Sequence, residues 1–403
     1  MQTIKQMLFL ISLVIVVVTS VSCGKDKETL EAEYIAKEPQ TIKQTEVSVS
    51  EAEKEQQKKE KEERERQERE RKEQEQKEQL EKEETEKEIP GGKQKSVLTG
   101  LLIDEEKANL RPYAIMINNI KKVNNKQSGL SEASILYEAL VEGGITRLMG
   151  IFEDFSSDRI GSIRSARHYY ASIADEYDAI FVHYGQTKYA TSKIKSLGLD
   201  NLSGLESVGS TVYYRDKTIS APHNAFASYD RIIKGTNQKN YRTKRNTDWE
   251  NHYTFYKKDT NLLDGQSVIK VALGFSNYTT PYFEYNKEEQ LYERFQFGGA
   301  HIDASIGKQL KFKNIIIQLV KEWNIDKNGY QTMDIENASG KGYYITNGKM
   351  VSITWQKNET TSKMHYYDEA GNILKVNEGK TFIAVYPTSR TDYLNFTSSG
   401  EIE

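Results

Sequence analysis

The sequence has one cysteine in 403 residues and lacks the short motifs that identify common catalytic sites. Cys23 alone cannot form a disulfide within the chain, so a folded part must rely on its hydrophobic core. GxSxG, HExxH, GxxxxGK[ST] and GxGxxG are absent, which argues against common serine hydrolases, zinc peptidases and nucleotide-binding loops. The formal net charge is only −3. We therefore expect no metal site, no cofactor and no nucleic-acid partner.

A hydrophobic run long enough for a comfortable membrane span is also missing from the N-terminus. The apolar run at residues 7–18 is shorter than the roughly 20 residues that a span requires. It follows Lys5 and precedes TSVSC, an order typical of a secretory signal. Ser20-Val21-Ser22-Cys23 resembles a lipobox, with Ser where Leu is usual. We predict a lipoprotein signal peptide at 1–23 and acylation, including palmitate, on Cys23; ordinary secretion or an uncleaved anchor is the alternative.

Apolar residues are nearly absent from residues 51–88, which consist mostly of Glu, Lys, Arg and Gln. This composition cannot build a core, and without apolar a and d positions it does not predict a coiled coil. Glu and Lys or Arg recur four residues apart, which favours a helix. We predict that residues 24–95 form a charged low-complexity spacer, either helical or disordered, that holds a domain away from a membrane.

From residue 96 the sequence has the hydrophobic patterns of a folded α/β region. Buried strands are predicted at 113–119, 146–152 and 178–185. Helices are predicted around 133–141, 165–174 and 187–196, the first with Ser131 as its N-cap. This alternation predicts a layered α/β domain at 96–260 with a largely parallel sheet.

Helical patterns disappear beyond about residue 260. Segments that alternate, or that are rich in β-branched and aromatic residues, are separated by turn signals such as Asn328-Gly329 and Asn347-Gly348. They predict a mostly antiparallel, β-rich region at 261–403, either a second domain or an extension of the first sheet. The chain as a whole is then of the α+β class. We interpret its many tyrosines as sheet formers rather than as a sugar- or peptide-binding surface.

Several motifs resemble the YerB-like family of bacterial lipoproteins, over about residues 97–388. They are QSGLSEASILYEALVEGGITR, IGSIRSAR, HYG, APHN and KGYYITNGK. The resemblance implies an extracytoplasmic, membrane-anchored lipoprotein with N- and C-terminal domains of unknown function. This sequence departs from the family pattern at Asn118, where the family usually has Asp, and at Ser162, where the family usually has Pro. The family's polar motif positions correspond here to Asn119, Gln127, Glu138, Glu142, Arg147, Arg164, Arg167, His183, His223 and Asn224.

Arg164 and Arg167 form the most distinctive part of the candidate site. In open α/β sheets, ligands bind at the carboxyl ends of the strands, which here predicts a site near 118–119, Glu153 and His183. The two arginines would lie at the start of a helix, where positive charge opposes the helix dipole. They therefore require an anion. It is either internal, from Glu138 or Glu142, or a bound carboxylate or phosphate.

Two functions follow from this site. In the first, an α/β cleft binds an anionic envelope ligand, such as a peptidoglycan fragment or wall polymer, or an envelope protein. In the second, the protein is an envelope hydrolase or transferase that uses His183 or His223 for acid–base chemistry beside Glu138 and Glu142. A packed, hydrogen-bonded histidine is the alternative for each imidazole. The lack of a complete catalytic motif favours binding, through Arg164, Arg167, Asn119, Gln127, Arg147 and Asn224.

Overall fold

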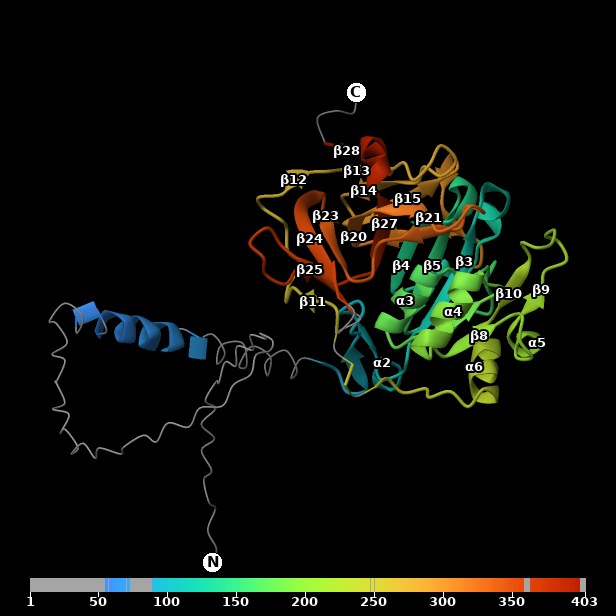
Figure 1. The fold of residues 1–403 in the computed structure, drawn as a ribbon, viewed down its shortest axis with the longest axis horizontal. Coiled ribbons are helices and arrows are strands. Elements are labelled where there is room, and N and C mark those ends of the chain that lie inside the picture. The colour runs from blue at the N-terminus through green and yellow to red at the C-terminus, as the bar shows by residue number, and fades with distance from the viewer. Residues whose placement is uncertain are drawn as a thin grey trace, which may run out of the picture. The chain divides into compact units, whose positions relative to one another are not determined.

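The computed structural model describes residues 55–56, 58–69, 71–72, 89–246, 248–249, 251–358 and 363–398. The predicted signal peptide and Cys23 lie outside these residues. The chain divides into two compact units, Met1–Gln79 and Leu80–Glu403 (Figure 1). No helix in the described ranges is both long enough and apolar enough to cross a membrane.

The described part of the charged spacer is helical. Residues 55–56, 58–69 and 71–72 are in helical conformation and exposed. Ion pairs four residues apart run along it, including Lys59–Glu55 at 3.0 Å and Lys72–Glu68 at 2.9 Å. Each such exposed pair contributes only about 0.3–0.5 kcal/mol.

The larger unit is built on an 11-stranded mixed sheet that takes strands from both predicted regions. The β-rich region extends the first sheet where β27 pairs in parallel with β4. In spatial order the strands are β12 (Gln266–Ser267), β24 (Lys349–Lys357), β23 (Ala338–Thr346), β20 (Asn314–Val320), β27 (Thr381–Pro387), β4 (Ile135–Leu140), β5 (Thr146–Phe152), β3 (Tyr113–Asn119), β7 (Ile180–His183) and β8 (Asn201–Ser203), and β25 (Met364–Tyr367) pairs with β24.

The central strands have the burial expected for a sheet covered on both faces. Every residue of β3, β4, β5 and β27 is buried. The neighbouring helices α3 (His168–Glu176) and α4 (Lys188–Leu197) lie in front of β3 and β5 in Figure 1. β3, β7 and β8 run parallel to one another, whereas β5 runs antiparallel to both of its neighbours. The α+β class is confirmed, with a mixed sheet at its centre.

The predicted helix through residues 133–141 is wrong, because this segment is strand β4. β4 lies between β27 and β5, and both of its faces are covered. A strand in such a place has apolar side chains at consecutive positions, and a short run of this kind fits a helical pattern equally well. Gly143 and Gly144, predicted as a helix stop, instead make the turn into β5 with φ of 73° and 72°. Glu138 and Glu142 therefore do not share a helix face.

A six-stranded antiparallel sheet packs on the large sheet through an aromatic layer. Phe283 and Phe312 of the small sheet lie 4.7 and 5.6 Å from Phe382 of β27, measured between ring centroids. Alternate residues of β15 are buried, as expected for a sheet with one covered face. This sheet consists of β16 (Gly299–Ala300), β15 (Leu291–Gln296), β14 (Tyr282–Asn286), β13 (Lys270–Leu273), β28 (Leu394–Thr397) and β19 (Lys311–Phe312).

The remaining helices and strands are short or peripheral. They are β1 (Lys93–Lys95), β2 (Leu102–Asp104), α2 (Glu105–Ala108), β6 (Ile160–Gly161), α5 (Gly209–Val212), β9 (Tyr214–Arg215), β10 (Ala225–Ala227), α6 (Tyr229–Gln238), β11 (Thr254–Phe255), β17 (Ile302–Asp303), β18 (Lys308–Gln309), β21 (Glu322–Asn324), β22 (Gln331–Met333) and β26 (Lys375–Val376).

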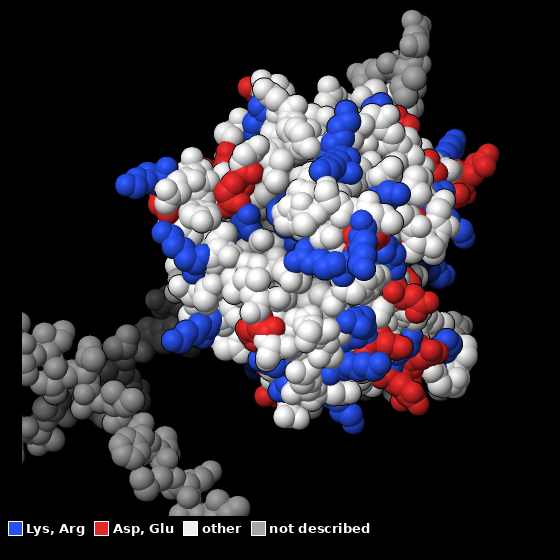
Figure 2. Space-filling view, turned by 90° about the vertical axis from the view of Figure 1, so that its right-hand side faces the viewer, with Lys and Arg blue, Asp and Glu red and all other residues white. Residues whose placement is uncertain are grey.

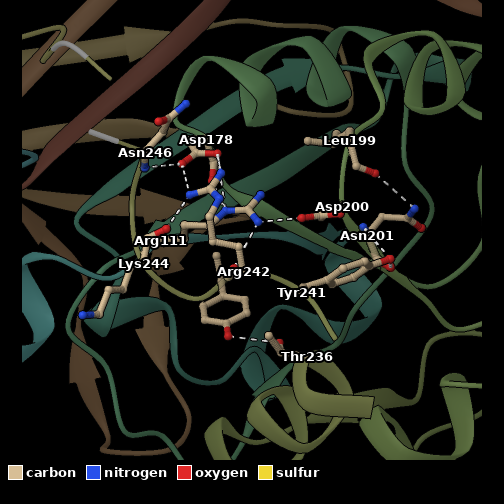
Figure 3. A network of polar contacts seen from close by, with 11 residues as sticks. Arg111, Asp178, Leu199, Asp200, Asn201, Thr236, Tyr241, Arg242, Lys244 and Asn246 are labelled. Atoms are coloured by element: carbon tan, nitrogen blue, oxygen red, sulfur yellow. Dashed lines mark hydrogen bonds and ion pairs between the residues drawn. The ribbon is translucent and has the colours of Figure 1, made fainter. Parts of the chain in front are cut away.

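A polar network holds the edge of the large sheet at which β3 and β7 begin (Figure 3). Arg111 lies just before β3; its Nε donates to the Asp178 carbonyl at 2.7 Å and its Nη1 to the Asp200 carboxylate at 2.6 Å. Arg242, which follows α6, donates to both carboxylate oxygens of Asp178 at 2.6 and 2.8 Å. The network ties the segment after α6 to the starts of β3 and β7.

Burial of His252 makes the fold sensitive to acid. Neither of its ring nitrogens has a hydrogen-bond partner among the described residues. Burial, followed by the charges of Lys363 and Lys357, lowers the pKa of His252 from 6.5 to about 3. The nearest carboxylate oxygen, Glu176 Oε2, lies 3.6 Å from His252 Nε2, beyond hydrogen-bond distance, and Lys357 binds the other oxygen of that carboxylate at 2.6 Å. The unfolded chain therefore takes up a proton at higher pH than the folded chain does.

We expect His252→Phe to reduce the acid sensitivity of the fold. Because the pKa of His252 is lower in the folded state, the stability is complete above pH 6.5 and is lost as the pH falls towards 3. Between pH 7 and 5 this one group should account for a loss of about 2 kcal/mol in the free energy of unfolding. Urea unfolding of parent and variant at both pH values measures it. Equal losses in the two proteins would contradict the assignment.

Candidate functional site

Some of the predicted site residues, among them Arg147, Arg164 and Arg167, lie at the edge where the parallel strands β3 and β7 end. β3 ends at Asn119 and β7 at His183, and their pairing in parallel puts both ends at one edge. Glu153 does not belong there, contrary to the sequence-based expectation, because β5 runs antiparallel to β3. At the other edge Glu153 accepts a hydrogen bond from Arg245 at 2.8 Å and another from Ser96.

The arginine-bearing stretch 161–167 lies directly before α3, which begins at His168 rather than at residue 165 as predicted. Its backbone is hydrogen-bonded to β3 and to the residues after β7. The N–H of Arg164 donates to the Met116 carbonyl at 3.1 Å, and the N–H of Ala166 donates to the Gly185 carbonyl at 2.9 Å. Arg167 is the residue immediately before the first helical residue, His168. The strands β3 and β7 therefore hold the segment from which the arginine side chains project.

Arg167 has its anion within the protein. Its Nε donates to both carboxylate oxygens of Glu142 at 2.9 Å, and its Nη2 also contacts that carboxylate. Its Nη1 donates to the carbonyl oxygens of Ser165 and Ala166 at 3.2 and 3.0 Å. Burial alone would raise the pKa of Glu142, but the hydrogen bonds and charge of Arg167 outweigh it and lower this pKa. Arg167 needs no ligand to balance its charge.

Arg147 and Arg164 have no such partner. No described carboxylate lies within 4.0 Å of either guanidinium group. Arg147 is 4% exposed; its Nη1 makes long contacts of 3.4 Å to Asn118 Oδ1 and to the Thr146 carbonyl, and its Nε has no hydrogen-bond partner in the described chain. Arg164 Nη1 donates to the Pro222 carbonyl at 3.0 Å, and its buried Nε is likewise unbonded.

The surroundings of these two arginines disfavour their charge. Burial, then the charges of Arg167 and Arg164, lower the pKa of Arg147 from 12.5 to about 9. Burial, then Arg167 and Arg215, lower the pKa of Arg164. A lowered arginine pKa means that the charged form is destabilised relative to water. A bound anion would reverse this effect.

His223 borders the two arginines on the side of β10. Asn118 Nδ2 lies 3.1 Å from His223 Nδ1. Because an amide nitrogen only donates, Nδ1 accepts and Nε2 of the neutral ring carries the proton. Burial, then the charges of Arg164, Lys122 and Arg147, lower the pKa of His223. The ring is therefore uncharged at neutral pH.

Arg215 adds a further positive charge beside these residues. Its Nη1 donates to Asn224 Oδ1 at 2.8 Å, and its guanidinium stacks 4.4 Å from the centre of the Tyr184 ring. Asn224, a predicted ligand-binding residue, thus positions Arg215. We call Arg147, Arg164, Arg215, Asn118 and His223 the arginine cluster.

Figure 2 shows the face on the side of β9 and β10. Lysine and arginine side chains run across the middle of this face, whereas the acidic side chains gather mainly near its lower right edge. An approaching anion therefore meets more positive than negative charge over the middle of this face.

Asn119, Gln127 and Glu138 lie in a different place, a fully buried network under the small sheet. Glu138 Oε1 accepts from Asn119 at 3.0 Å and from Thr146 at 2.6 Å, and its Oε2 accepts from Arg294 at 2.7 Å. All of these side chains are buried. The network joins β3 and β4 to β15, so its members connect the two sheets and are closed to a ligand.

The C-terminal side of this network was missed by sequence reasoning. His301 Nε2 lies 2.6 Å from Gln127 Oε1, and His301 also contacts Arg294. Burial, then the charge of Arg294, lowers the pKa of His301. One signal was present in the sequence: in QLYERFQFG the alternation puts Arg294 on the same face as Tyr292 and Gln296, which is the buried face.

His183 is a packed histidine rather than an accessible one. Its Nδ1 lies 2.9 Å from the Gly185 carbonyl and its Nε2 3.2 Å from Asn201 Oδ1. The side chain is fully buried, and burial lowers its pKa. Both ring nitrogens are occupied, which leaves His223 as the imidazole that borders the arginine cluster. In the described residues, no three His, Cys, Asp or Glu side chains are grouped to hold a metal ion.

Comparison with known proteins gives the same family for both halves of the chain. Residues 98–242 match the N-terminal domain, and residues 269–383 the C-terminal domain, of a protein of unknown function, DUF3048. The chain is 33% identical to "Putative lipoprotein YerB" of Bacillus subtilis (strain 168) over 296 residues, 73% of this chain and 87% of the relative. It is also similar to the crystal structure of the YerB protein from Bacillus subtilis, with a TM-score of 0.67 and 30% identity over 76% of this chain and all of that one.

Proposed function

The chain belongs to the DUF3048 family of YerB-like proteins, and from this premise we propose that it is a lipid-anchored, extracytoplasmic protein that binds an anionic envelope ligand at the arginine cluster. The relative is named as a lipoprotein. The signal-like segment 1–23 ends at Cys23, and a highly charged segment separates it from the folded unit. Acylation of Cys23 would anchor the chain to the outer face of the membrane.

One observation carries the binding proposal: two adjacent guanidinium groups, one buried and one half-buried, have no carboxylate within 4.0 Å in the described part of the chain. Arg167 has a carboxylate, so the segment can supply one where the charge is balanced internally. Arg147 and Arg164 have no carboxylate within 4.0 Å among the described residues, and the pKa of each is lowered by burial and by neighbouring positive charge. A ligand carboxylate or phosphate that accepts two hydrogen bonds from an arginine fits this chemistry.

A second candidate function is a hydrolase or transferase that uses His223 as its acid or base. The hydrogen bond from Asn118 to Nδ1 orients the ring and leaves the proton of the neutral ring on Nε2. Acid–base chemistry then requires either protonation of the ring or release of Nδ1 from Asn118. The fully bonded His183 offers no such support. This function predicts a turnover of wall material that His223→Ala abolishes and that His183→Ala affects only through stability.

The binding proposal is tested with soluble peptidoglycan fragments and the full chain. We expect Arg164→Gln to weaken retention of the fragments about tenfold or more, since a charge-assisted hydrogen bond contributes roughly 1.5–3 kcal/mol. Lys234→Gln, which removes an exposed charge on α6, is the matched control and should bind like the parent. Fragment masses identify the ligand after elution. Equal retention by parent, Arg164→Gln and control would contradict a ligand role for the cluster.

A further inference from the structure

A large cavity lies away from the arginine cluster. It has a volume of about 1020 Å³ and is lined by segments 257–259, 289–291, 306–313 and 378–380 together with the QSGLSE motif. Pockets for drug-sized ligands are commonly about 300–1000 Å³, so this one has room for a sizeable molecule.

Part of the cavity lining is apolar. Leu130, Leu310 and Phe312 are buried beneath it. Leu101 and Ile306 belong to its lining and are 44% and 51% exposed. Large aliphatic side chains in contact with water are costly by about 25 cal/mol per Å² of apolar surface. A ligand with an apolar part would cover them.

Lysines surround this apolar lining, and several of them have no carboxylate partner. Six lysines and three carboxylates line the cavity. Lys311 and Lys313 are paired, with Glu289 at 2.6 Å and Asp259 at 2.8 Å respectively. Lys258, Lys308 and Lys380 have no carboxylate within 4.0 Å in the described part of the chain.

Lys380 is held in position by the QSGLSE motif. Its Nζ donates to the Ser131 carbonyl. Ser131 and Gly129 are in turn fixed by Asp303, which accepts from the N–H of Gly129 at 2.9 Å and from the N–H and hydroxyl of Ser131 at 2.8 and 2.7 Å. Gly129 has φ of 79°, and an added Cβ would lie 2.9 Å from the Arg159 carbonyl, so this turn requires glycine. A motif that the arginine cluster does not use therefore builds one wall of the cavity.

We propose that this cavity binds a phosphorylated amphiphile, with its apolar chain on Leu101, Ile306 and the buried floor, and its phosphate between Lys258, Lys308 and Lys380. A phosphate presents several charged oxygens and can accept from more than one ammonium group at a time, which a single carboxylate does less well. The site is separate from the arginine cluster and does not depend on the function proposed for it.

The proposal is tested by titrating the full chain with three probes in a calorimeter: octyl phosphate below its critical micelle concentration, inorganic phosphate and octanol. We expect octyl phosphate to bind at least about tenfold more tightly than either of the others, because only it fills both parts of the site. Octyl phosphate binding no tighter than inorganic phosphate would overturn the proposal.

Matched variants localise the binding. Lys258→Glu with Lys308→Glu should weaken octyl phosphate about tenfold or more and leave octanol unchanged, while Ile306→Ser should weaken both. All three residues are exposed, so the fold should persist. Lys234→Glu and Leu205→Ser, exposed and outside the cavity, are the controls. Loss of octyl phosphate binding in Arg164→Gln instead would assign the ligand to the arginine cluster and overturn the proposal.

Vesicles separate a soluble ligand from a membrane lipid of the same chemistry. If vesicles that contain phosphatidic acid displace octyl phosphate from the parent and do not bind the double lysine variant, the ligand comes from the membrane. If octyl phosphate binds and the vesicles do not displace it, the ligand is soluble. If the vesicles bind the parent and all cavity variants equally, they adsorb to a charged surface of the protein, and this result would count against the site.

Discussion

Replacing Glu138 with glutamine is expected to lower the free energy of unfolding by about 3–5 kcal/mol. Glu138 and Arg294 are an ion pair at 2.7 Å, and both side chains are 0% exposed. Glutamine keeps the shape and the acceptor oxygen, but it leaves the guanidinium without a counter-charge in the interior. Urea unfolding followed by circular dichroism measures the change, provided that the slope with denaturant is unchanged.

Two further variants separate loss of the pair from loss of packing. Adding Arg294→Met to Glu138→Gln should recover most of the stability, because the stranded charge is removed as well. Asp104→Asn breaks the exposed pair Lys93–Asp104 at 2.7 Å and should change stability far less. If Glu138→Gln and Asp104→Asn cost the same, the buried network does not hold the two sheets together.

Arg147→Met is expected to abolish anion binding at the arginine cluster without destabilising the protein. The lowering of the Arg147 pKa from 12.5 to about 9 corresponds to about 5 kcal/mol that disfavours the charge. Methionine is apolar, fills a similar space and removes this term, so we expect the free energy of unfolding to stay constant or rise by about 1–3 kcal/mol. Affinity for anionic wall fragments should fall about 100-fold. Denaturant unfolding and fragment titration are measured on the same preparation.

Neighbouring substitutions give the opposite pattern and serve as controls. Arg167→Met should destabilise the protein, because Arg167 is already bonded to Glu142 and its removal strands that carboxylate. Asn118→Asp would supply an internal carboxylate 3.4 Å from Arg147 Nη1, at the position where the YerB-like resemblance implies Asp. It should stabilise the free protein and compete with the ligand. A large loss of stability in Arg147→Met would mean that this guanidinium is structural.

The contrast between Arg147 and Arg294 separates function from stability. Both arginines are buried, but Arg294 pairs with a carboxylate, whereas Arg147 has none within 4.0 Å among the residues that the structure describes. A charged group that is destabilised in the free protein, and that a bound ligand stabilises, is typical of binding sites. Such a site gains affinity at the expense of the stability of the free protein. Substitutions that raise stability and lower binding would therefore point to the site directly.

Much of the local structure could be predicted because it depends on neighbouring residues. The runs at 113–119 and 146–152 coincide with β3 and β5, and the turn Asn347-Gly348 connects β23 and β24. Residues with β-branched or aromatic side chains between turn formers favour strands whatever their partners are. The charged composition of the spacer and the motifs shared with the YerB-like family are equally properties of the sequence alone.

The partners of the site residues were decided by the tertiary structure. Glu138 pairs with Arg294, which lies 156 residues further along the chain, and no local pattern encodes that contact. The sequence of β4 could not be distinguished from that of a helix, because both faces of the strand are covered. Glu153 lies at the opposite edge from the one expected, because β5 runs antiparallel to β3. The sequence determined that positive charge gathers before α3. Only the tertiary packing decided that Arg167 pairs with a carboxylate and that, among the described residues, Arg147 and Arg164 do not.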